Sequence, residues 1–124
     1  MVSCVTQGVK VSVETFFQPD KAEHFAFAYR VTIENEGEDA IQLLNRHWKI
    51  FDSVHFYREV TGEGVVGQQP VLKPGDRYQY VSGCFLRSDY GKMNGSYEMI
   101  NLKNGVKFPA RIPDFLLVPA YKMN

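Results

Sequence analysis

Two stretches of this chain alternate apolar and polar side chains with a period of two residues, which is the pattern of a β-strand that buries one face. One stretch covers residues 9–15. The other covers residues 25–34, where every second residue from Phe25 to Ile33 is aromatic or β-branched. An amphipathic helix would instead repeat its apolar residues every three to four positions. The pattern therefore predicts two half-buried strands and constrains the chain to a fold built on sheets.

The composition also favours strands. The chain has nine Phe, seven Tyr and fourteen Val but only six Ala, and aromatic and β-branched side chains suit a pleated surface, whereas Ala suits a helix. A helix is the alternative for residues 41–56, where the alternation is less regular. The pattern as a whole predicts an all-β fold, a sandwich or a barrel, of about seven or eight strands. The further predicted strands are 41–56, 57–60, 65–66, 77–81, 96–102 and 106–112.

Turn signals separate the predicted strands. A turn is expected at residues 19–23, and the polar residues 35–39, which include a Gly, are typical of a hairpin loop. Asn104-Gly105 predicts a type I′ hairpin, because both central residues of that turn need a positive φ. Proline cannot donate to a β-ladder, so Pro109 and Pro113 predict that the last strand lies at a sheet edge.

The length of 124 residues is that of one ordinary domain, so residues 1–124 are predicted to form a single β-sandwich domain. The formal net charge is zero, with an excess of four acidic residues in 1–39 and of four basic residues in 40–124. A nucleic-acid-binding protein would carry a basic excess to neutralise phosphates, so this class is not favoured. The uneven distribution predicts two solvated surfaces of opposite charge. Head-to-tail attraction between copies, which would make a homo-oligomer, is the alternative.

The chain has two cysteines, Cys4 and Cys84, which lack the C-x-x-C spacing of a redox or metal site. No basic segment followed by an apolar one opens the sequence, and no apolar run approaches the roughly 20 residues of a membrane span. A cytoplasmic location is therefore expected, with both thiols reduced and no membrane as a partner. A disulfide between the two cysteines is the alternative.

A glycine-rich motif occupies residues 62–67. Its glycines match the G-x-G-x-x-G pattern, which lets a tight turn approach a pyrophosphate at a helix N-terminus. Pro70 and Pro74 leave no room for a helix after the motif, so a dinucleotide-binding domain is not favoured. Two interpretations remain open: the glycines supply positive φ between two strands, or successive N–H groups bind an anion. In the second case the ligand-binding residues would be Gly62, Gly64, Gly67, Gln68 and Gln69.

Other residues that carry chemistry are scattered along the sequence. His24, His47 and His55 lack the spacing of a metal site, so neither a metal nor a cofactor is predicted. No Ser or Cys stands in a nucleophile motif and no carboxylate pair is recognisable, so no catalytic residue is predicted. Trp48 is interpreted as a core residue, with a stacking platform for a ligand as the alternative.

Several motifs, in order along the chain, resemble the ApaG family. Residues 54–58, Val-His-Phe-Tyr-Arg, depart from it, because relatives tend to carry a glycine turn and polar residues there. This departure is expected to alter the surface beside the glycine loop. The resemblance covers nearly the whole chain, and ordered matches are more specific than any single motif. The matching segments are Arg46-x-Trp48-x-Ile50-x-Asp52, residues 64–70 with Leu72-x-Pro74-Gly75, residues 80–84, residues 91–97, and Ile112-Pro113-Asp114-Phe115-x-Leu117.

The resemblance implies an immunoglobulin-like or fibronectin type III-like β-sandwich. It implies little about activity: ApaG proteins are named for a bacterial gene neighbour that hydrolyses diadenosine tetraphosphate, and similar domains end certain eukaryotic F-box and polymerase-interacting proteins. A non-catalytic module that binds a protein partner is therefore the leading hypothesis. The second is a binder of a phosphate or pyrophosphate group, as in a nucleotide or dinucleoside polyphosphate, at the glycine-rich loop. An enzyme acting alone is the third.

Overall fold

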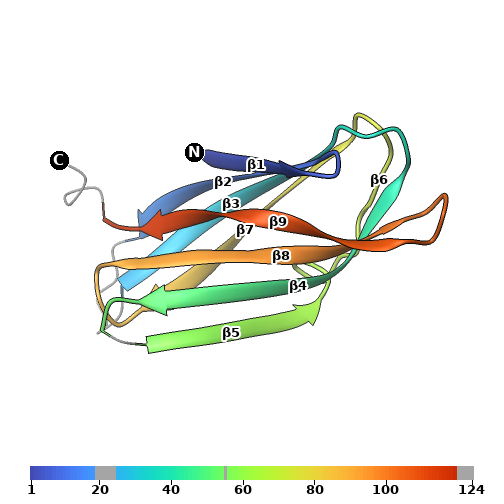
Figure 1. Cartoon of the computed structure of the whole chain (residues 1–124). Coiled ribbons are helices and arrows are strands. Elements are labelled where there is room, and N and C mark those ends of the chain that lie inside the picture. The colour runs from blue at the N-terminus through green and yellow to red at the C-terminus, as the bar shows by residue number, and fades with distance from the viewer. Residues whose placement is uncertain (19–24, 55, 120–124) are drawn as a thin grey trace.

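The computed structural model describes residues 1–18, 25–54 and 56–119, so the predicted turn at 19–23 lies outside the described residues. In the described part every regular element is a strand, nine in all (Figure 1). The helical alternative for residues 41–56 is therefore wrong. No helix that could cross a membrane is found in these ranges. The strands are β1 (Val2–Thr6), β2 (Val9–Gln18), β3 (Phe25–Asn35), β4 (Ile41–Asp52), β5 (Phe56–Glu63), β6 (Val71–Leu72), β7 (Arg77–Leu86), β8 (Gly91–Asn101) and β9 (Lys107–Leu117).

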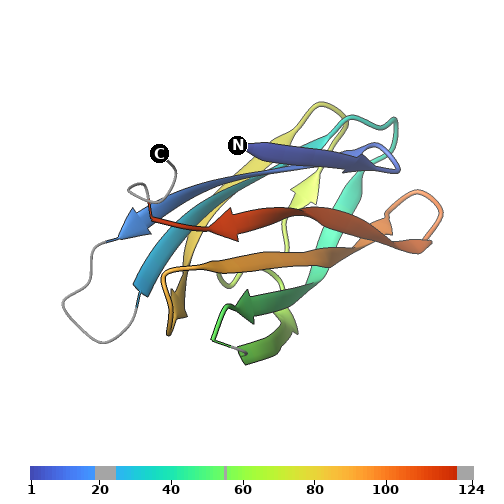
Figure 2. The same cartoon turned by 60° about the vertical axis from the view of Figure 1, so that its left-hand side comes forward.

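The strands form two antiparallel sheets that pack face to face (Figures 1 and 2). One sheet has the order β1-β2-β3-β7, and the other has the order β5-β4-β8-β9 with the short β6 beside β4. The predicted all-β sandwich is confirmed. The described residues hold more strands than predicted, because β1 has five residues and β6 has two, too few to display a clear alternation.

The buried face of each sheet is the one that the alternation predicts. Trp48 is 3% exposed, and its ring lies 5.3 Å from that of Tyr29 in the opposite sheet. The rings of Tyr97 and Phe115 meet it edge-on. Trp48 is thus a core residue, as predicted. The large side chains that are most completely buried are Tyr97, Phe27, Ile33, Leu43, Leu86, Met93, Met99, Ile112 and Leu117.

Residues 36–40 carry the chain from one sheet to the other, so the predicted hairpin loop at 35–39 is wrong. β3 pairs with β2 and β7, whereas β4 belongs to the second sheet. Asn35, which is 2% exposed, holds the crossing: its side-chain amide donates to the carbonyls of Asp39 and Leu72, and its Oδ1 accepts from the Gly37 N–H. A polar loop with a Gly suits both geometries, so the local residues could not distinguish them.

The type I′ prediction at Asn104-Gly105 is also wrong. Only Gly105 has a positive φ, of 73°, and its N–H donates to the carbonyl of Asn101 in a longer loop. The Asn101 side chain accepts from the Asn104 N–H, which holds Asn104 in a different conformation. Two consecutive positive φ values instead occur at Gln7-Gly8 (48° and 80°) and at Val66-Gly67 (47° and 76°).

β9 lies at a sheet edge, as its prolines predict. Between the pairs Met93–Phe115 and Gly95–Ile112 the register of β8 and β9 shifts, and Pro113 falls in this β-bulge, where a missing N–H costs no ladder bond. Gly95 allows β8 to approach β4 closely, since a Cβ at this position would lie 2.0 Å from the carbonyl oxygen of His47.

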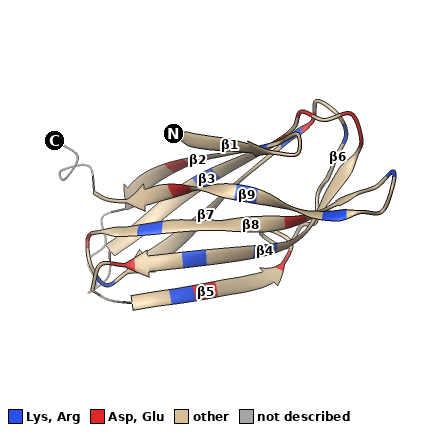
Figure 3. Ribbon diagram, viewed as in Figure 1, with Lys and Arg blue, Asp and Glu red and all other residues tan. Residues whose placement is uncertain are grey.

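The outer face of the β5-β4-β8-β9 sheet carries charges of both signs (Figure 3). Lys49 on β4, for example, lies directly opposite Glu59 on β5. The uneven distribution of charge along the chain therefore does not make this face a surface of one sign.

Cys4 and Cys84 are both free thiols, as expected. They lie on β1 and β7, which form opposite edges of one sheet with β2 and β3 between them. At roughly 4.8 Å per strand, the two strands are about 14 Å apart, too far for a disulfide.

Candidate functional site

The glycines of the 62–67 motif have different roles. Gly62 lies within β5, opposite Arg46, and its φ is not positive, so the expected role as a turn residue is wrong for this glycine. Gly64 and Gly67 lie in the connection that follows β5, with φ values of 64° and 76°. Only these two therefore use the conformational freedom of glycine.

The connection after β5 folds into a tight hairpin. The backbones of Val65 and Gln68 bond to each other in both directions, at 2.8 and 2.9 Å. They enclose Val66-Gly67, whose two positive φ values are those of a type I′ turn. The predicted strand at 65–66 is thus reduced to a single bridge. Val66 is a β-branched residue in a left-handed conformation, which stores strain.

A β-bulge in β4 anchors this hairpin. The register between β4 and β8 shifts at Leu44, which turns its carbonyl out of the ladder. That carbonyl accepts from the Gly64 N–H at 2.8 Å and from the Gln69 side-chain amide at 2.9 Å. Of the predicted ligand-binding residues, Gly64, Gln68 and Gln69 thus already donate hydrogen bonds to the chain itself.

Arg46 holds the same hairpin from the middle of β4. Its Nη1 donates to the carbonyl oxygens of Glu63 at 3.0 Å and Gly64 at 2.9 Å. The guanidinium lies against Gly62, where a Cβ would come within 2.6 Å of Nη2. Gly62 is therefore needed for the close approach of an arginine. Sequence reasoning noticed Arg46 only as part of a family motif, since the pairing of β4 with β5 creates this contact.

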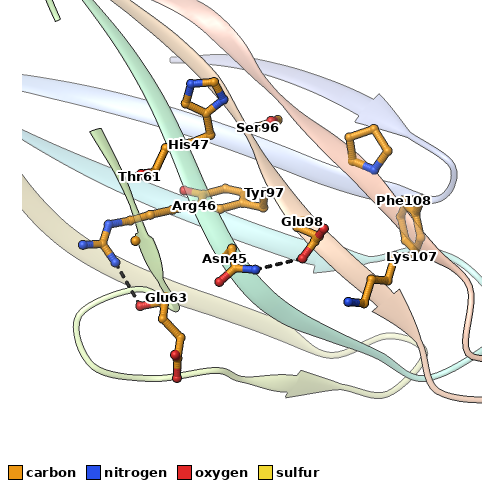
Figure 4. Close-up of a pocket in the computed structure, with 12 residues that line it drawn as sticks. Asn45, Arg46, His47, Thr61, Glu63, Ser96, Tyr97, Glu98, Lys107 and Phe108 are labelled. Carbon is orange, nitrogen blue, oxygen red and sulfur yellow. Dashed lines mark hydrogen bonds between the residues drawn. The ribbon is translucent and has the colours of Figure 1, made fainter. Parts of the chain in front are cut away.

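A shallow hollow on the outer face of the second sheet borders Arg46 (Figure 4). In it, the Asn45 amide donates to Glu98 at 2.8 Å. Nε2 of His47 lies 3.5 Å from a carboxylate oxygen of Glu59. Asn45 and His47 are therefore each engaged by an acidic side chain, and Glu63 and Lys107 add one charge of each sign to the lining of the hollow.

The histidines give no sign of a metal site in the described part of the chain. No cluster of three His, Cys, Asp or Glu side chains there could hold a metal ion. His24 and His55 lie outside the described residues.

A more enclosed cleft opens between the two sheets, on the side where β5 and β7 are the edge strands. Its volume is about 430 Å³, a size typical of ligand-binding sites. Trp48 and Ile50 form part of its floor, and Tyr29 contributes from the opposite sheet. The other described residues that line it are Arg46, Arg58, Val60, Val65, Val66, Tyr80, Val81, Ser82, Gly83, Cys84, Phe85 and Met93.

Two arginines are the formally charged side chains among these lining residues. Arg58 on β5 reaches across to β7, where its Nη2 donates to the Phe85 carbonyl at 2.9 Å and to Sγ of Cys84 at 3.4 Å. The ion pairs formed by the described residues include neither Arg46 nor Arg58. A guanidinium has five N–H donors, so each arginine has more donors than its contacts use.

Burial keeps the other titratable groups of the cleft neutral. It raises the pKa of Tyr29, against the opposing effect of a hydrogen bond with Ser82. It also raises the pKa of Tyr80 and that of the Cys84 thiol, the latter against the charge of Arg58. The cleft is therefore positively charged at neutral pH, and Cys84 is a protonated thiol, which is a poor nucleophile.

The described residues of the stretch 54–58, Val54 and Phe56–Arg58, lie at the opposite end of β5 from the glycine hairpin. Phe51 and Tyr57 pack with ring centroids 4.8 Å apart, and the Arg87 guanidinium lies 4.1 Å from the centre of the Phe56 ring. Phe56 and Glu63 are seven steps apart along an extended strand, a span of about 23 Å. The aromatic residues of this stretch therefore lie away from the glycine hairpin, whereas Arg58 lines the same cleft as Val65 and Val66 of the hairpin.

Comparison with known protein families matches residues 16–101 to the ApaG domain. Protein ApaG from Anaeromyxobacter dehalogenans is 42% identical over 126 residues, which cover all of both chains. Protein ApaG from Nitrosomonas europaea is 46% identical over 113 residues, which cover 88% of each chain.

Two solved structures are similar over nearly the whole chain. The putative ApaA protein from Bordetella pertussis has a TM-score of 0.86 and 38% identity, covering 97% of this chain and 98% of that one. A Northeast Structural Genomics Consortium target has a TM-score of 0.89 and 36% identity, covering 95% and 92%. None of these names states a reaction or a ligand.

Proposed function

This chain belongs to the ApaG domain family, and on that premise we propose that it is a non-catalytic, cytoplasmic module that binds a protein partner in the cleft between β5 and β7. The cleft combines apolar walls with two arginines, and neither arginine forms an ion pair with a described carboxylate. Arginine in a partly desolvated pocket is a frequent anchor of protein interfaces. The immunoglobulin-like or fibronectin type III-like assignment of the sandwich is part of the same proposal.

Selection from a displayed library of random peptides tests this function. Peptides that bind should shift the backbone amide resonances of β5 and β7 in an isotope-labelled protein. Arg58→Gln should weaken the binding of these peptides, while the matched substitution Arg77→Gln, at the start of β7 and paired with Glu34 at 3.5 Å, should not. A library that yields no binder, or binders that leave β5 and β7 unperturbed, would contradict the proposal.

A phosphate-binding function at the glycine hairpin is the second candidate. The Arg46 guanidinium lies on the backbone of this hairpin and supplies the positive charge that an anion would need. Against it, the N–H groups of Gly64, Val65 and Gln68 already bond to carbonyls of the chain.

Thermal unfolding with inorganic pyrophosphate or a dinucleoside polyphosphate separates the two candidates. A ligand that binds the folded state raises the melting temperature by mass action. We expect no shift. A saturable shift that is lost in Gly64→Ala would make the hairpin the functional site.

A further inference from the structure

β7 has an open edge beside the cleft. It pairs with β3 and with no other described strand. The Phe85 carbonyl points away from β3, because it accepts from Arg58 on β5. In an antiparallel ladder the backbone groups of alternate residues point the same way. Val81 and Gly83 therefore direct their N–H and C=O groups outward, where a further strand could pair with them.

Two of the other three sheet edges, β9 and β1, are less suited to accept a strand, and the third, β5, borders the same cleft from the opposite sheet. β9 contains two prolines and a β-bulge, which block regular pairing. β1 has only five residues. β7 has ten residues, Arg77–Leu86, and no proline. An open edge of this length is the kind that proteins use to bind an extended peptide by adding a strand.

The pleat determines which side chains of an added strand would enter the cleft. Ser82 and Cys84 of β7 face inward. Residues directly opposite each other in a sheet lie on the same face. The peptide residues opposite inward-facing positions of β7 would therefore also point inward, and they recur at i, i+2 and i+4.

The two arginines match this spacing. Arg58 lies opposite Ile50 on β4, and Arg46 lies four residues before Ile50. The backbone positions of the two arginines along the sheet are therefore about 13 Å apart. Residues i and i+4 of an extended peptide, in either direction, are the same distance apart. Trp48 and its partner Val60 lie midway between the arginines and provide an apolar surface for residue i+2.

Charge decides the kind of occupant. The cleft is positive, so acidic side chains complement it. The β7 strand of a second copy contains no acidic side chain, and its one charged residue, Arg77, is paired with Glu34. A second β7 would therefore offer no carboxylate to the two cleft arginines, which disfavours a dimer through this edge.

From this arrangement, and resting on the proposed function, we infer that the cleft binds an extended segment of a protein partner with the pattern acid-x-apolar-x-acid. The segment pairs with the open edge of β7. Its two carboxylates bind Arg46 and Arg58, and its apolar side chain packs on Trp48 and Val60.

Synthetic ten-residue peptides with Glu-x-Leu-x-Glu at their centre test the inference, by calorimetry and by amide shifts on β7. An isomer with the two Glu residues moved to the positions adjacent to Leu has the same composition. Its affinity should be lower than that of the parent peptide by a factor of about ten or more. Replacing both Glu by Lys should abolish binding. Binding of the parent peptide should weaken with salt and in Arg58→Gln, and not in Arg77→Gln.

A proline substitution in β7 tests the pairing of the peptide backbone separately from the charges. Val81→Pro removes an outward N–H while leaving the ladder to β3 intact, and prolines are tolerated at such edge positions. It should abolish peptide binding, and Val81→Thr should not. If Val81→Pro does not fold, a peptide N-methylated on the residue that pairs with Val81 gives the same comparison.

The outcomes distinguish this inference from the function on which it rests. Equal binding of the two Glu isomers at β5 and β7 would overturn the spacing and leave the interaction function in place. Equal binding of a free dicarboxylate such as adipate, unaffected by Val81→Pro, would show that the cleft takes a small anion. A stable dimer in sedimentation that Val81→Pro dissociates would identify a second copy as the occupant. If neither these peptides nor any library peptide binds at the cleft, both proposals are wrong.

Discussion

At the scale of single residues, Asp52 links the end of β4 to the connection that follows β7. Burial favours a higher pKa for its carboxyl, but hydrogen bonds from the Ser88 hydroxyl and the Arg87 N–H outweigh it and lower the pKa. The folded protein thus gains stability from this carboxylate above its unfolded pKa of about 3.9. That stability is lost as the pH falls through the lower, folded pKa.

We therefore expect Asp52→Asn to be less stable than the parent at neutral pH, with a difference that disappears in acid. Urea unfolding over a series of pH values measures it. Ser88→Ala removes the hydroxyl that donates to Asp52 and should therefore reduce the pH dependence of the unfolding free energy. A constant difference between parent and Asp52→Asn down to acid pH would contradict this account.

The Arg46 and Gly62 pair is a second test at this scale. In Gly62→Ala the new Cβ would displace the guanidinium and break its bonds to the hairpin carbonyls. We expect a loss of about 1 kcal/mol in unfolding free energy. The loss should nearly vanish in an Arg46→Ala background, as a double-mutant cycle would show. Gly83→Ala is the control, because its Cβ would meet its nearest neighbour at an ordinary 3.4 Å.

At the scale of elements, the Val65–Gln68 hairpin contains stored strain that substitution can release. Val66→Asn creates Asn-Gly, the sequence that type I′ turns prefer, and should raise the unfolding free energy by about 1 kcal/mol. Gly67→Ala should lower it by about 1 kcal/mol through φ alone, because no atom lies within 4 Å of its Cβ. Gly64→Ala should lower it further, since its Cβ would lie 2.3 Å from the Gln68 carbonyl oxygen.

Chemical denaturation of these three variants ranks them directly. Gln7→Asn is the matched comparison, because Gln7-Gly8 has the same pair of positive φ values far from the cleft. A stabilisation by Gln7→Asn without one by Val66→Asn would mean that contacts of Val66 in the cleft outweigh the strain of its backbone.

At the scale of the whole molecule, a buried pair of hydroxyls joins the two sheets. Tyr80 on β7 and Tyr97 on β8 hydrogen-bond to each other in the core. Tyr97→Phe leaves the Tyr80 hydroxyl without this partner and should cost about 1–3 kcal/mol. Replacing both tyrosines by Phe should cost less than the sum of the single substitutions, because no polar group is then stranded. Equilibrium unfolding of the four proteins measures this coupling, and strict additivity would contradict it.

The sequence by itself determined the class of fold, the buried face of the long strands and the edge position of β9. These features follow from local rules: side chains alternate along a strand, and proline cannot donate to a ladder. The same local information could not decide between a hairpin and a crossing at residues 36–40. Nor could it place Asn104-Gly105, where the Asn101 side chain competes for the turn backbone.

Only the tertiary structure decided the candidate site. The glycine motif was visible in the sequence, but the separate role of Gly62 depends on the register that places Arg46 opposite it. Arg46 and Arg58 line one cleft because β4 pairs with β5 and because β7 of the other sheet faces them. Strand pairing and sheet packing join residues that are distant in the chain, and their energies depend on contacts that no local pattern encodes.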